Sequence, residues 1–238
     1  MKRILCSIVA LMIILGLCSC SKNEAPSVTS ETDSALLSAS DESSNASGNI
    51  TDHLKNIPPD CDQLILTVGE GDYDATIYCF ERESNIWTEK YVFAGFIGKN
   101  GLGKTAEGDM KSPSGYYSLG TAFGRIENPG TKMPFRLITK NDYWDDDVES
   151  ATYNTWQTSD PPQTEKMDIP AYNYGFVINY NPECTKGLGS AIFFHCAESY
   201  TAGCTGTAQD NVIAVLQWLD PDKNPIICQC YRDEMDKY

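Results

Sequence analysis

Positive charge is scarce in this chain. Its 238 residues include 18 lysines and arginines against 33 aspartates and glutamates, a formal net charge of −15. A surface of this sign repels polyphosphate, so the composition argues against a nucleic-acid partner. Histidine is scarcer still: the chain has two, His53 and His195. A reaction that depends on an imidazole therefore has only these two candidate residues.

Long apolar runs are also missing, apart from one near the N-terminus. Residues 4–17 form an apolar stretch after Lys2 and Arg3, which is the layout of a secretory signal and is short for a membrane-spanning helix of about 20 residues. The stretch ends in Leu-Cys-Ser-Cys, which resembles a bacterial lipobox. We predict a lipoprotein signal peptide over residues 1–19, with Cys20 as the lipidated residue that anchors the protein to the membrane.

Aromatic residues are absent from the segment that follows. Residues 21–56 are rich in Ser, Thr, Asp and Glu and have no periodic apolar face, so this segment cannot bury enough surface to offset its ordering entropy. We predict a disordered tether over residues 20–56, including the lipidated cysteine. Residues 57–238 then form one domain, held in the cell envelope and facing the wall.

Cysteine, by contrast, is plentiful. Of the ten cysteines, two leave with the predicted signal and Cys20 carries lipid, so seven remain in the domain. An odd number in an exported chain leaves at least one thiol free or paired between molecules. If Cys204 is the free thiol, three disulfides of open pairing can join the other six: Cys61, Cys79, Cys184, Cys196, Cys228 and Cys230.

The domain reads mostly as β-strand. Short segments rich in β-branched and aromatic residues are bounded by Gly, Pro and other turn formers, at 63–68, 75–80, 90–98, 115–120, 135–139, 174–180, 190–196 and 224–230. One helix is expected at about 208–219, capped by Thr207 and ended by Asp220-Pro221, with Val212, Leu216 and Leu219 at helical spacing. The fold class expected is mainly β, a sandwich or barrel with one C-terminal helix.

"GKNGLGKT", residues 98–105, satisfies the phosphate-binding loop pattern at every specified position. Such a loop needs a helix that begins at its Lys-Thr. Gly108, Pro113 and Gly115 follow Lys104 closely, which excludes that helix. We therefore interpret the match as a β-hairpin connection and expect no nucleotide to bind.

Chemistry concentrates near the end of the chain. His195 closes the strand "SAIFFHC", and Cys204 follows nine residues later in "YTAGCTG", directly after Gly203. An imidazole close to a thiol can remove its proton and create a nucleophilic thiolate. The Cys204 amide could also help to bind an oxyanion.

"HCAESYTAGCTG" resembles the active-site signature of the L,D-transpeptidase (YkuD-type) domain family, through His195, Thr201, Gly203 and Cys204. "KSPSGYYSLG" upstream is similar to the family's Thr-Pro-Thr-Gly-type hairpin, and the likeness covers most of residues 62–230. The resemblance implies a cysteine enzyme that acylates itself with a peptidoglycan stem tetrapeptide, releases D-alanine and transfers the acyl group to an amine, or to water as an L,D-carboxypeptidase. It implies Cys204 as nucleophile, His195 as general base, and Gly203 with Cys204 as oxyanion donors. We expect a monomer without cofactor or metal.

The sequence also departs from that family. Cys196 stands where a glycine usually follows the histidine, Ala202 where a histidine is common, and Gly206 where an arginine usually lies two residues after the cysteine. The spacer between His195 and Cys204 is shorter than usual. Without the arginine, the group that holds the substrate carboxylate is not identified.

Two alternatives compete with an enzyme. A zinc site would need His195, Cys196 and Cys204 with Cys228 and Cys230, but adjacent strand residues face opposite sides. A Cys196–Cys204 disulfide would instead make a non-catalytic cell-envelope module, and the same alternation argues against it. A count of free thiols separates this disulfide module from the enzyme.

Other conspicuous residues have plainer interpretations. Asp145-Asp146-Asp147 lacks the glycine and distal glutamate of an EF-hand calcium loop and is expected to be a solvated loop. Trp218 is expected in the core. Tyr172 and Tyr174 could line a groove but are favoured as sheet packing.

Overall fold

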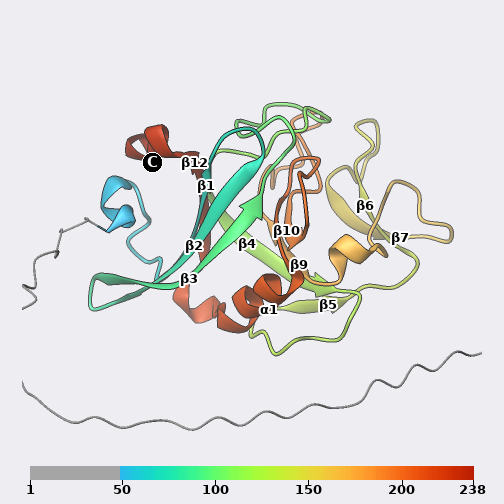
Figure 1. Ribbon diagram of the computed structural model, residues 1–238. Helices are drawn as coiled ribbons and strands as arrows, with labels where there is room; N and C mark the ends of the chain where they lie inside the picture. The colour runs from blue at the N-terminus through green and yellow to red at the C-terminus, as the bar shows by residue number, and fades with distance from the viewer. Residues whose placement is uncertain (1–48) are drawn as a thin grey trace, which may run out of the picture. The chain divides into compact units, whose positions relative to one another are not determined.

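Eight strands close into a mixed β-barrel in the computed structural model, which describes residues 49–238 (Figure 1). The barrel strands are β1 (Gln63–Gly69), β2 (Asp74–Glu83), β3 (Ile86–Phe96), β4 (Gly115–Gly124), β9 (Gly175–Ile178), β10 (Phe193–Cys196), β11 (Thr205–Thr207) and β12 (Ile226–Tyr231). Their order is β12-β1-β2-β3-β11-β10-β9-β4, and β4 pairs with β12 to close the ring. The β1–β12 and β10–β11 pairs are parallel. The predicted fold class, mainly β with one C-terminal helix, is confirmed.

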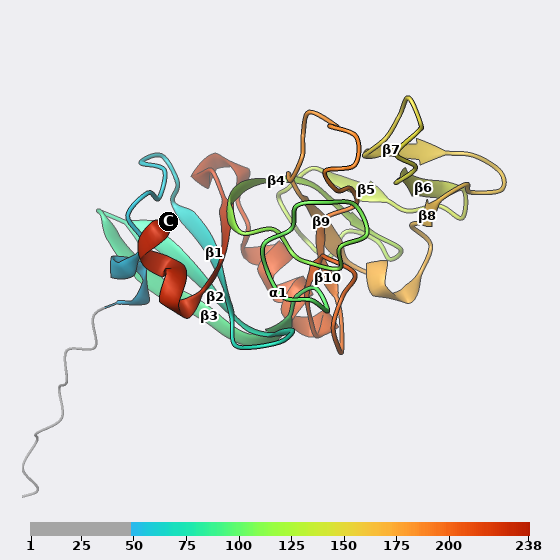
Figure 2. The same cartoon turned by 90° about the horizontal axis from the view of Figure 1, so that it is seen from above.

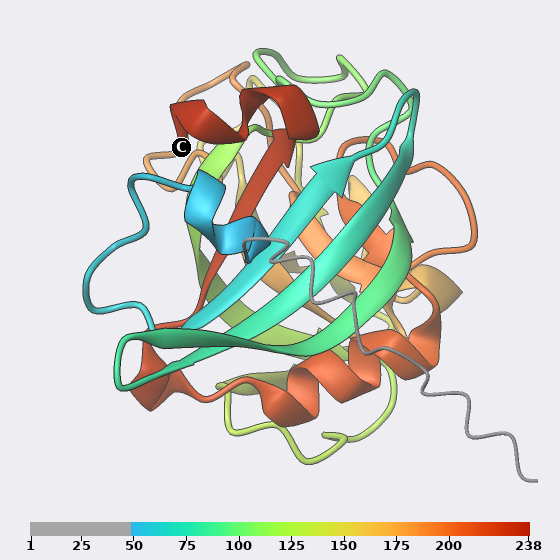
Figure 3. The same cartoon turned by 60° about the vertical axis from the view of Figure 1, so that its left-hand side comes forward.

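Strand β1 shows how the sequence builds two cores. All seven of its residues are buried, which explains a continuous apolar run in place of strict alternation. Ile65 packs in a cluster with residues of the helix α1 (Gln209–Trp218), whereas Leu64 and Leu66 pack in a second cluster with residues from both ends of the described chain. The helix lies across one end of the barrel strands in Figure 3.

The helix agrees with the prediction except at its start. Val212 and Leu216 face the core with no exposed surface, as expected from their spacing. The N-cap is Ala208, which makes no side-chain cap hydrogen bond. The predicted cap, Thr207, is instead the last residue of β11, and its hydroxyl donates to the Ala94 carbonyl at 2.7 Å. The residue predicted as the helix cap is therefore part of β11, which pairs in parallel with β10.

A second, three-stranded sheet was not predicted. It has the order β7-β6-β8 and comprises β6 (Asp142–Asp145), β7 (Thr155–Thr158) and β8 (Glu165–Lys166), while β5 (Phe135–Leu137) extends the barrel sheet beside β4 (Figure 2). Asp145, predicted in a solvated loop, is 4% exposed and accepts hydrogen bonds from the hydroxyls of Ser150 and Thr152. That part of the prediction is wrong, because these hydroxyls satisfy the carboxylate at the end of a strand.

The described chain begins earlier than the predicted domain. Short 3₁₀ helices form at η1 (Ile50–His53), η2 (Pro170–Tyr172), η3 (Pro221–Lys223) and η4 (Arg232–Lys237). Leu54 is buried against Met235 of η4 in the second core cluster, and the Lys55 amide donates to the Tyr238 carbonyl. Residues 49–56, predicted as the end of the tether, are thus part of the fold because Leu54 supplies core surface.

Several predictions concern residues outside the described part of the chain. These are the signal peptide over 1–19, lipidation at Cys20, and the tether up to residue 48. Within the described residues, no helix is long and apolar enough to cross a membrane.

The predicted disulfides are not formed: all seven cysteines of the described chain are free thiols. Their placement separates Cys79 from three of the others. Cys79 packs with Ile65 on the α1 side of the sheet, whereas Cys61, Cys228 and Cys230 lie in the second core cluster. A count of cysteines in the sequence could not show which of them lie on the α1 side of the sheet and which lie in the second core cluster.

Candidate active site

Cys204 lies in the loop between β10 and β11, directly before β11 begins. The preceding Gly203 has a φ of +145°, a conformation that favours glycine. A Cβ at this position would lie 2.9 Å from the Lys111 carbonyl oxygen, so the close approach of two backbones also requires glycine. The glycine before Cys204 is therefore required by the structure of the loop.

Two hydroxyl groups hold the backbone of this loop. Thr201 Oγ1 donates to the Cys204 carbonyl at 2.6 Å, and Ser112 Oγ donates to the same carbonyl at 2.7 Å. Ser112 also accepts from the Gly98 amide at 2.9 Å. The upstream "KSPSG" segment, remote in sequence, thus fixes the position of the cysteine.

The Cys204 thiol is buried but partnered. The residue is 6% exposed; its Sγ accepts from the Phe193 amide at 3.3 Å and donates to the Ala191 carbonyl at 3.2 Å. Burial raises the pKa of this thiol to about 12, although the Phe193 amide acts to lower it. The resting group is therefore the neutral thiol at neutral pH.

His195 is also neutral and has a defined tautomer. Its Nδ1 lies 2.9 Å from the Cys196 carbonyl oxygen, which can only accept, so Nδ1 carries the proton and Nε2 keeps its lone pair. Burial lowers the pKa of His195, outweighing the opposite effect of that hydrogen bond. An imidazole in this state is suited to accept a proton at Nε2.

The structure brings His195 and Cys204 to one cavity without joining them directly. A cavity of 430 Å³ is lined by both residues together with Thr201 and Tyr172. The rings of Tyr172 and His195 pack edge to face, with centroids 5.3 Å apart. Among the described residues, no hydrogen bond connects the imidazole to the Cys204 thiol, which points to Ala191 instead.

Cys204 lines a second cavity of 220 Å³, which several ionisable side chains also line. The ionisable side chains that line it with the thiol are Lys104, Glu107, Asp146, Glu165 and Tyr172. The Tyr172 hydroxyl donates to Glu165 at 2.8 Å. Burial raises the pKa of Glu165, and Asp146 adds to the effect. Tyr172 therefore lines both cavities and lies between His195 and this carboxyl group.

The predicted oxyanion donors are not equivalent. The Gly203 amide already donates to Thr201 Oγ1 at 3.1 Å. That contact holds the turn, so the Cys204 amide is the member of the predicted pair that we retain for an oxyanion. Thr201 supports the loop through both of its hydrogen bonds.

Strand β10 separates the cysteines as its alternation predicts. Phe193 packs with Cys204, while Phe194 and Cys196 pack in the cluster that contains α1. The Cys196 thiol donates to the Tyr174 carbonyl at 3.5 Å. A Cys196–Cys204 disulfide would have to cross the strand, so the disulfide-locked alternative loses its geometric basis.

Residues 98–105 contain no helix, as predicted. The hairpin interpretation is wrong, because β3 pairs with β2 and β11, whereas β4 pairs with β5, β9 and β12. The segment is a crossing loop: Gly98 forms a bridge with Thr201, and the Lys104 amide donates to the Ser112 carbonyl. This path brings Lys104 beside Gly203 and Cys204.

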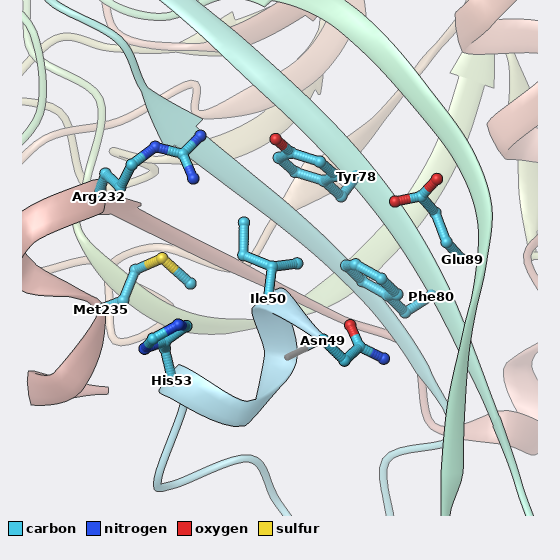
Figure 4. A pocket seen from close by; sticks show the side chains of 8 residues that line it. All are labelled: Asn49, Ile50, His53, Tyr78, Phe80, Glu89, Arg232 and Met235. Atoms are coloured by element: carbon cyan, nitrogen blue, oxygen red, sulfur yellow. The ribbon is translucent and has the colours of Figure 1, made fainter. Parts of the chain in front are cut away.

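A larger cavity, of 620 Å³, lies elsewhere (Figure 4). Its lining residues are Asn49, Ile50, His53, Tyr78, Phe80, Glu89, Arg232 and Met235, which come from the ends of the described chain and from β2 and β3. His53, predicted in the tether, is therefore part of a cavity wall. This cavity contains none of the predicted site residues, so its size alone does not identify the chemistry.

Sequence reasoning missed Lys104 as a site residue, and it favoured sheet packing for Tyr172. Each had a signal in the sequence: Lys104 belongs to the "GKNGLGKT" match, and Tyr172 was considered as a groove residue. Glu165 carried no signal, because its neighbourhood was not predicted to be a strand. The folding of the β7-β6-β8 sheet beside the barrel brings it to the site.

No family model matches the chain, and no curated protein matches it. Solved structures show distant similarity. Bd1075 of Bdellovibrio bacteriovorus aligns with TM-score 0.40 and 18% identity over 74% of this chain and 52% of that chain. A mutant of the helical cell shape determining protein Pgp2 from Campylobacter jejuni gives TM-score 0.41 and 16% identity, over 76% and 53% of the two chains. Unsubstituted Pgp2 gives 0.38 and 16%, over 73% and 51%. The present chain spans about half the length of each of these proteins.

Proposed function

We propose that this protein is a peptidoglycan L,D-transpeptidase that uses Cys204 as its nucleophile and His195 as its general base. The observation that carries the proposal is the presence of a neutral thiol and a neutral imidazole on one cavity, with Nε2 of the imidazole free to accept a proton. The resemblance of the His195–Cys204 segment to the family signature supplies the substrate class, a stem tetrapeptide of the wall.

The first step begins with a turn of the thiol. The Cys204 side chain leaves the Ala191 carbonyl and rotates toward His195, a change between staggered rotamers. The thiol proton passes to Nε2 of His195 while Sγ bonds to the carbonyl carbon of the L-to-D peptide bond. The carbonyl electrons move to the oxygen, which the Cys204 amide binds as an oxyanion.

The second step releases D-alanine. The oxyanion collapses, the C–N bond breaks, and the leaving amine takes the proton from His195. The thioester that remains is attacked by the amine of a second stem. His195 takes a proton from that amine, the C–S bond breaks, and the sulfur regains its proton. Water in place of the amine gives trimming in place of cross-linking.

We also propose that the protein lies in the cell envelope and acts on the stem peptides of the wall. We assign lipidation to Cys20 and a tether to the residues after it, so that the domain reaches wall stem peptides from a membrane anchor. The domain would act as a monomer and without a cofactor.

The proposal is tested by intact mass after incubation of the protein with a carbapenem, since the family resemblance implies that such β-lactams acylate the nucleophile. Wild type should gain one adduct and Cys204→Ala none. Cys196→Ala is the matched control, because its thiol faces the other side of β10, and it should gain the adduct like wild type.

A stem tetrapeptide then separates the reactions. Release of D-alanine with a cross-linked product identifies transfer, whereas release with the tripeptide alone identifies hydrolysis. An unmodified wild type that also releases no D-alanine from the tetrapeptide would overturn the enzyme assignment.

A further inference from the structure

Lys104 is the lysine of the "GKNGLGKT" segment, and the proposed mechanism has given it no role. Its side chain is 2% exposed. Its Nζ lies 3.5 Å from the position that a Cβ on Gly203 would occupy, and it lines the 220 Å³ cavity together with Cys204. A lysine is rarely buried this far unless its charge is used or paired.

The pairing is incomplete. Within the described residues, Asp109 is the one side-chain acceptor found for the ammonium, at 2.9 Å, whereas an ammonium has three protons to donate. The other oxygen of Asp109 accepts from the amides of Thr105 and Ala106. Burial opposes ionisation, but these hydrogen bonds lower the pKa of Asp109 to about 2. Asp109 therefore holds the lysine in place, and two of the three ammonium donors have no acceptor among the described side chains, on a residue that lines the cavity.

The other charged residues that line this cavity are acidic. Glu107, Asp146 and Glu165 line it, and Lys104 is the one cation among its lining residues. Glu107 accepts from the hydroxyls of Tyr153 and Ser190. A thiolate or oxyanion at Cys204 would form among these carboxylates in a low-dielectric site, where each charge acts strongly.

We propose that Lys104 stabilises the negative charge that develops at Cys204 during acyl transfer, on the sulfur and on the oxyanion. The site thereby gains a cation from the β3–β4 loop, far in sequence from the cysteine. This inference rests on the proposed function for its role in turnover. Its effect on the thiol itself is measurable without any wall substrate.

The electrostatic balance at the thiol supports this role. Burial is the largest influence and raises the pKa of Cys204; the Phe193 amide lowers it, Glu165 raises it, and Lys104 lowers it by the smallest of these effects. Removing the lysine charge leaves only the Phe193 amide to oppose burial and Glu165. Fewer thiolates then exist at any given pH.

The test uses methyl methanethiosulfonate, a small neutral reagent that the thiolate attacks at sulfur with loss of methanesulfinate. The second-order rate at Cys204, located by peptide fragmentation, is measured between pH 7 and 9. Lys104→Gln keeps a donor for Asp109 but removes the charge, and should react about tenfold more slowly at every pH, equivalent to one pKa unit. Lys104→Arg keeps the charge and should stay close to wild type.

The matched control is Lys132→Gln, whose side chain is 68% exposed and pairs with Asp220; its rate should equal that of wild type. Wild-type reactivity of Lys104→Gln, or equal slowing by Gln and Arg, would overturn the inference, the second result showing a role in packing. Should Lys104→Gln not fold by near-UV circular dichroism, Lys104→Met is measured in its place. A tenfold effect in a protein that carbapenem does not modify would retain this inference while removing the proposed function.

Discussion

The two faces of strand β10 have different surroundings. On one face, Phe193 and His195 meet Cys204 and Tyr172 beside two cavities. On the other, Phe194 stacks on Phe176 with centroids 4.9 Å apart, and both are fully buried. One strand of four residues thus separates the candidate site from a face of apolar packing, because successive side chains point to opposite sides.

The difference teaches why His195 and Cys196 cannot be interpreted as one unit. The imidazole lines the 430 Å³ cavity and keeps a free nitrogen. Cys196 also lines that cavity, but its side chain packs against the α1 cluster and its thiol donates to the Tyr174 carbonyl. Burial raises the pKa of Cys196, so that thiol is also neutral, but its surroundings contain core side chains in place of a base. Adjacency in sequence is therefore a poor guide to shared chemistry on a strand.

The largest effect on activity is expected from the reactive face. His195→Gln removes the proton acceptor and should slow acylation of Cys204 by about 10²–10⁴-fold, the range typical for a general base. The rate of carbapenem adduct formation, followed by mass, measures this. Unfolding midpoints in urea should stay close to wild type, and a variant that acylates at the wild-type rate would show that another group takes the proton.

The largest effect on stability is expected from the opposite face. Phe194→Ala should lower the free energy of unfolding by about 3–5 kcal/mol, the range for truncating a buried phenylalanine. Urea denaturation followed by tryptophan fluorescence checks it. Phe194→Leu serves as the milder control and should lose less. If Phe194→Ala instead lowered acylation at unchanged stability, the division between the faces would be wrong.

The pH dependence sharpens the same comparison. Because burial lowers the pKa of His195 from 6.5, the neutral base persists to mildly acidic pH, and the acylation rate should fall only below pH 6.5, about tenfold per unit. The unfolded chain binds this proton more readily than the folded one, so the stabilising contribution is present above pH 6.5 and is lost as pH falls through the folded pKa. His195→Gln should remove that part of the stability change in urea titrations between pH 7 and 5.

Most strands of the barrel could be predicted from local sequence. Strand β1 and helix α1 were predicted because their apolar spacing matches what they bury, and the alternation along β10 separated Cys196 from Cys204 correctly. The family signature identified His195 and Cys204 as site candidates, and the structure places both on one cavity. These features depend on neighbours within a few residues.

Features set by contacts distant in sequence were not predictable in this way. Lys104 enters the site because the Ser112 carbonyl accepts from its amide while the Ser112 hydroxyl bonds Cys204, and no local pattern encodes that path. The β7-β6-β8 sheet is built from two- and four-residue strands, too short to show a period. The disulfide expectation rested on counting thiols, which ignores the face that each one occupies.

The smallest effect is expected for Cys196→Ala, and it bears directly on the comparison. The side chain is half-buried and packs at the edge of the α1 cluster, so losing its sulfur should cost about 1 kcal/mol of stability or less. Acylation of Cys204 should remain within about twofold of wild type, since the thiol lies across the strand from the reactive face. Adduct rates and urea midpoints measured on the same preparation check both values. A large fall in acylation would mean that Cys196 acts on His195 through its backbone, because the Cys196 carbonyl fixes the imidazole tautomer. Cys196→Ser separates loss of volume from loss of the thiol. Serine occupies nearly the same volume as cysteine, so a fall equal to that of alanine would assign the effect to the thiol itself.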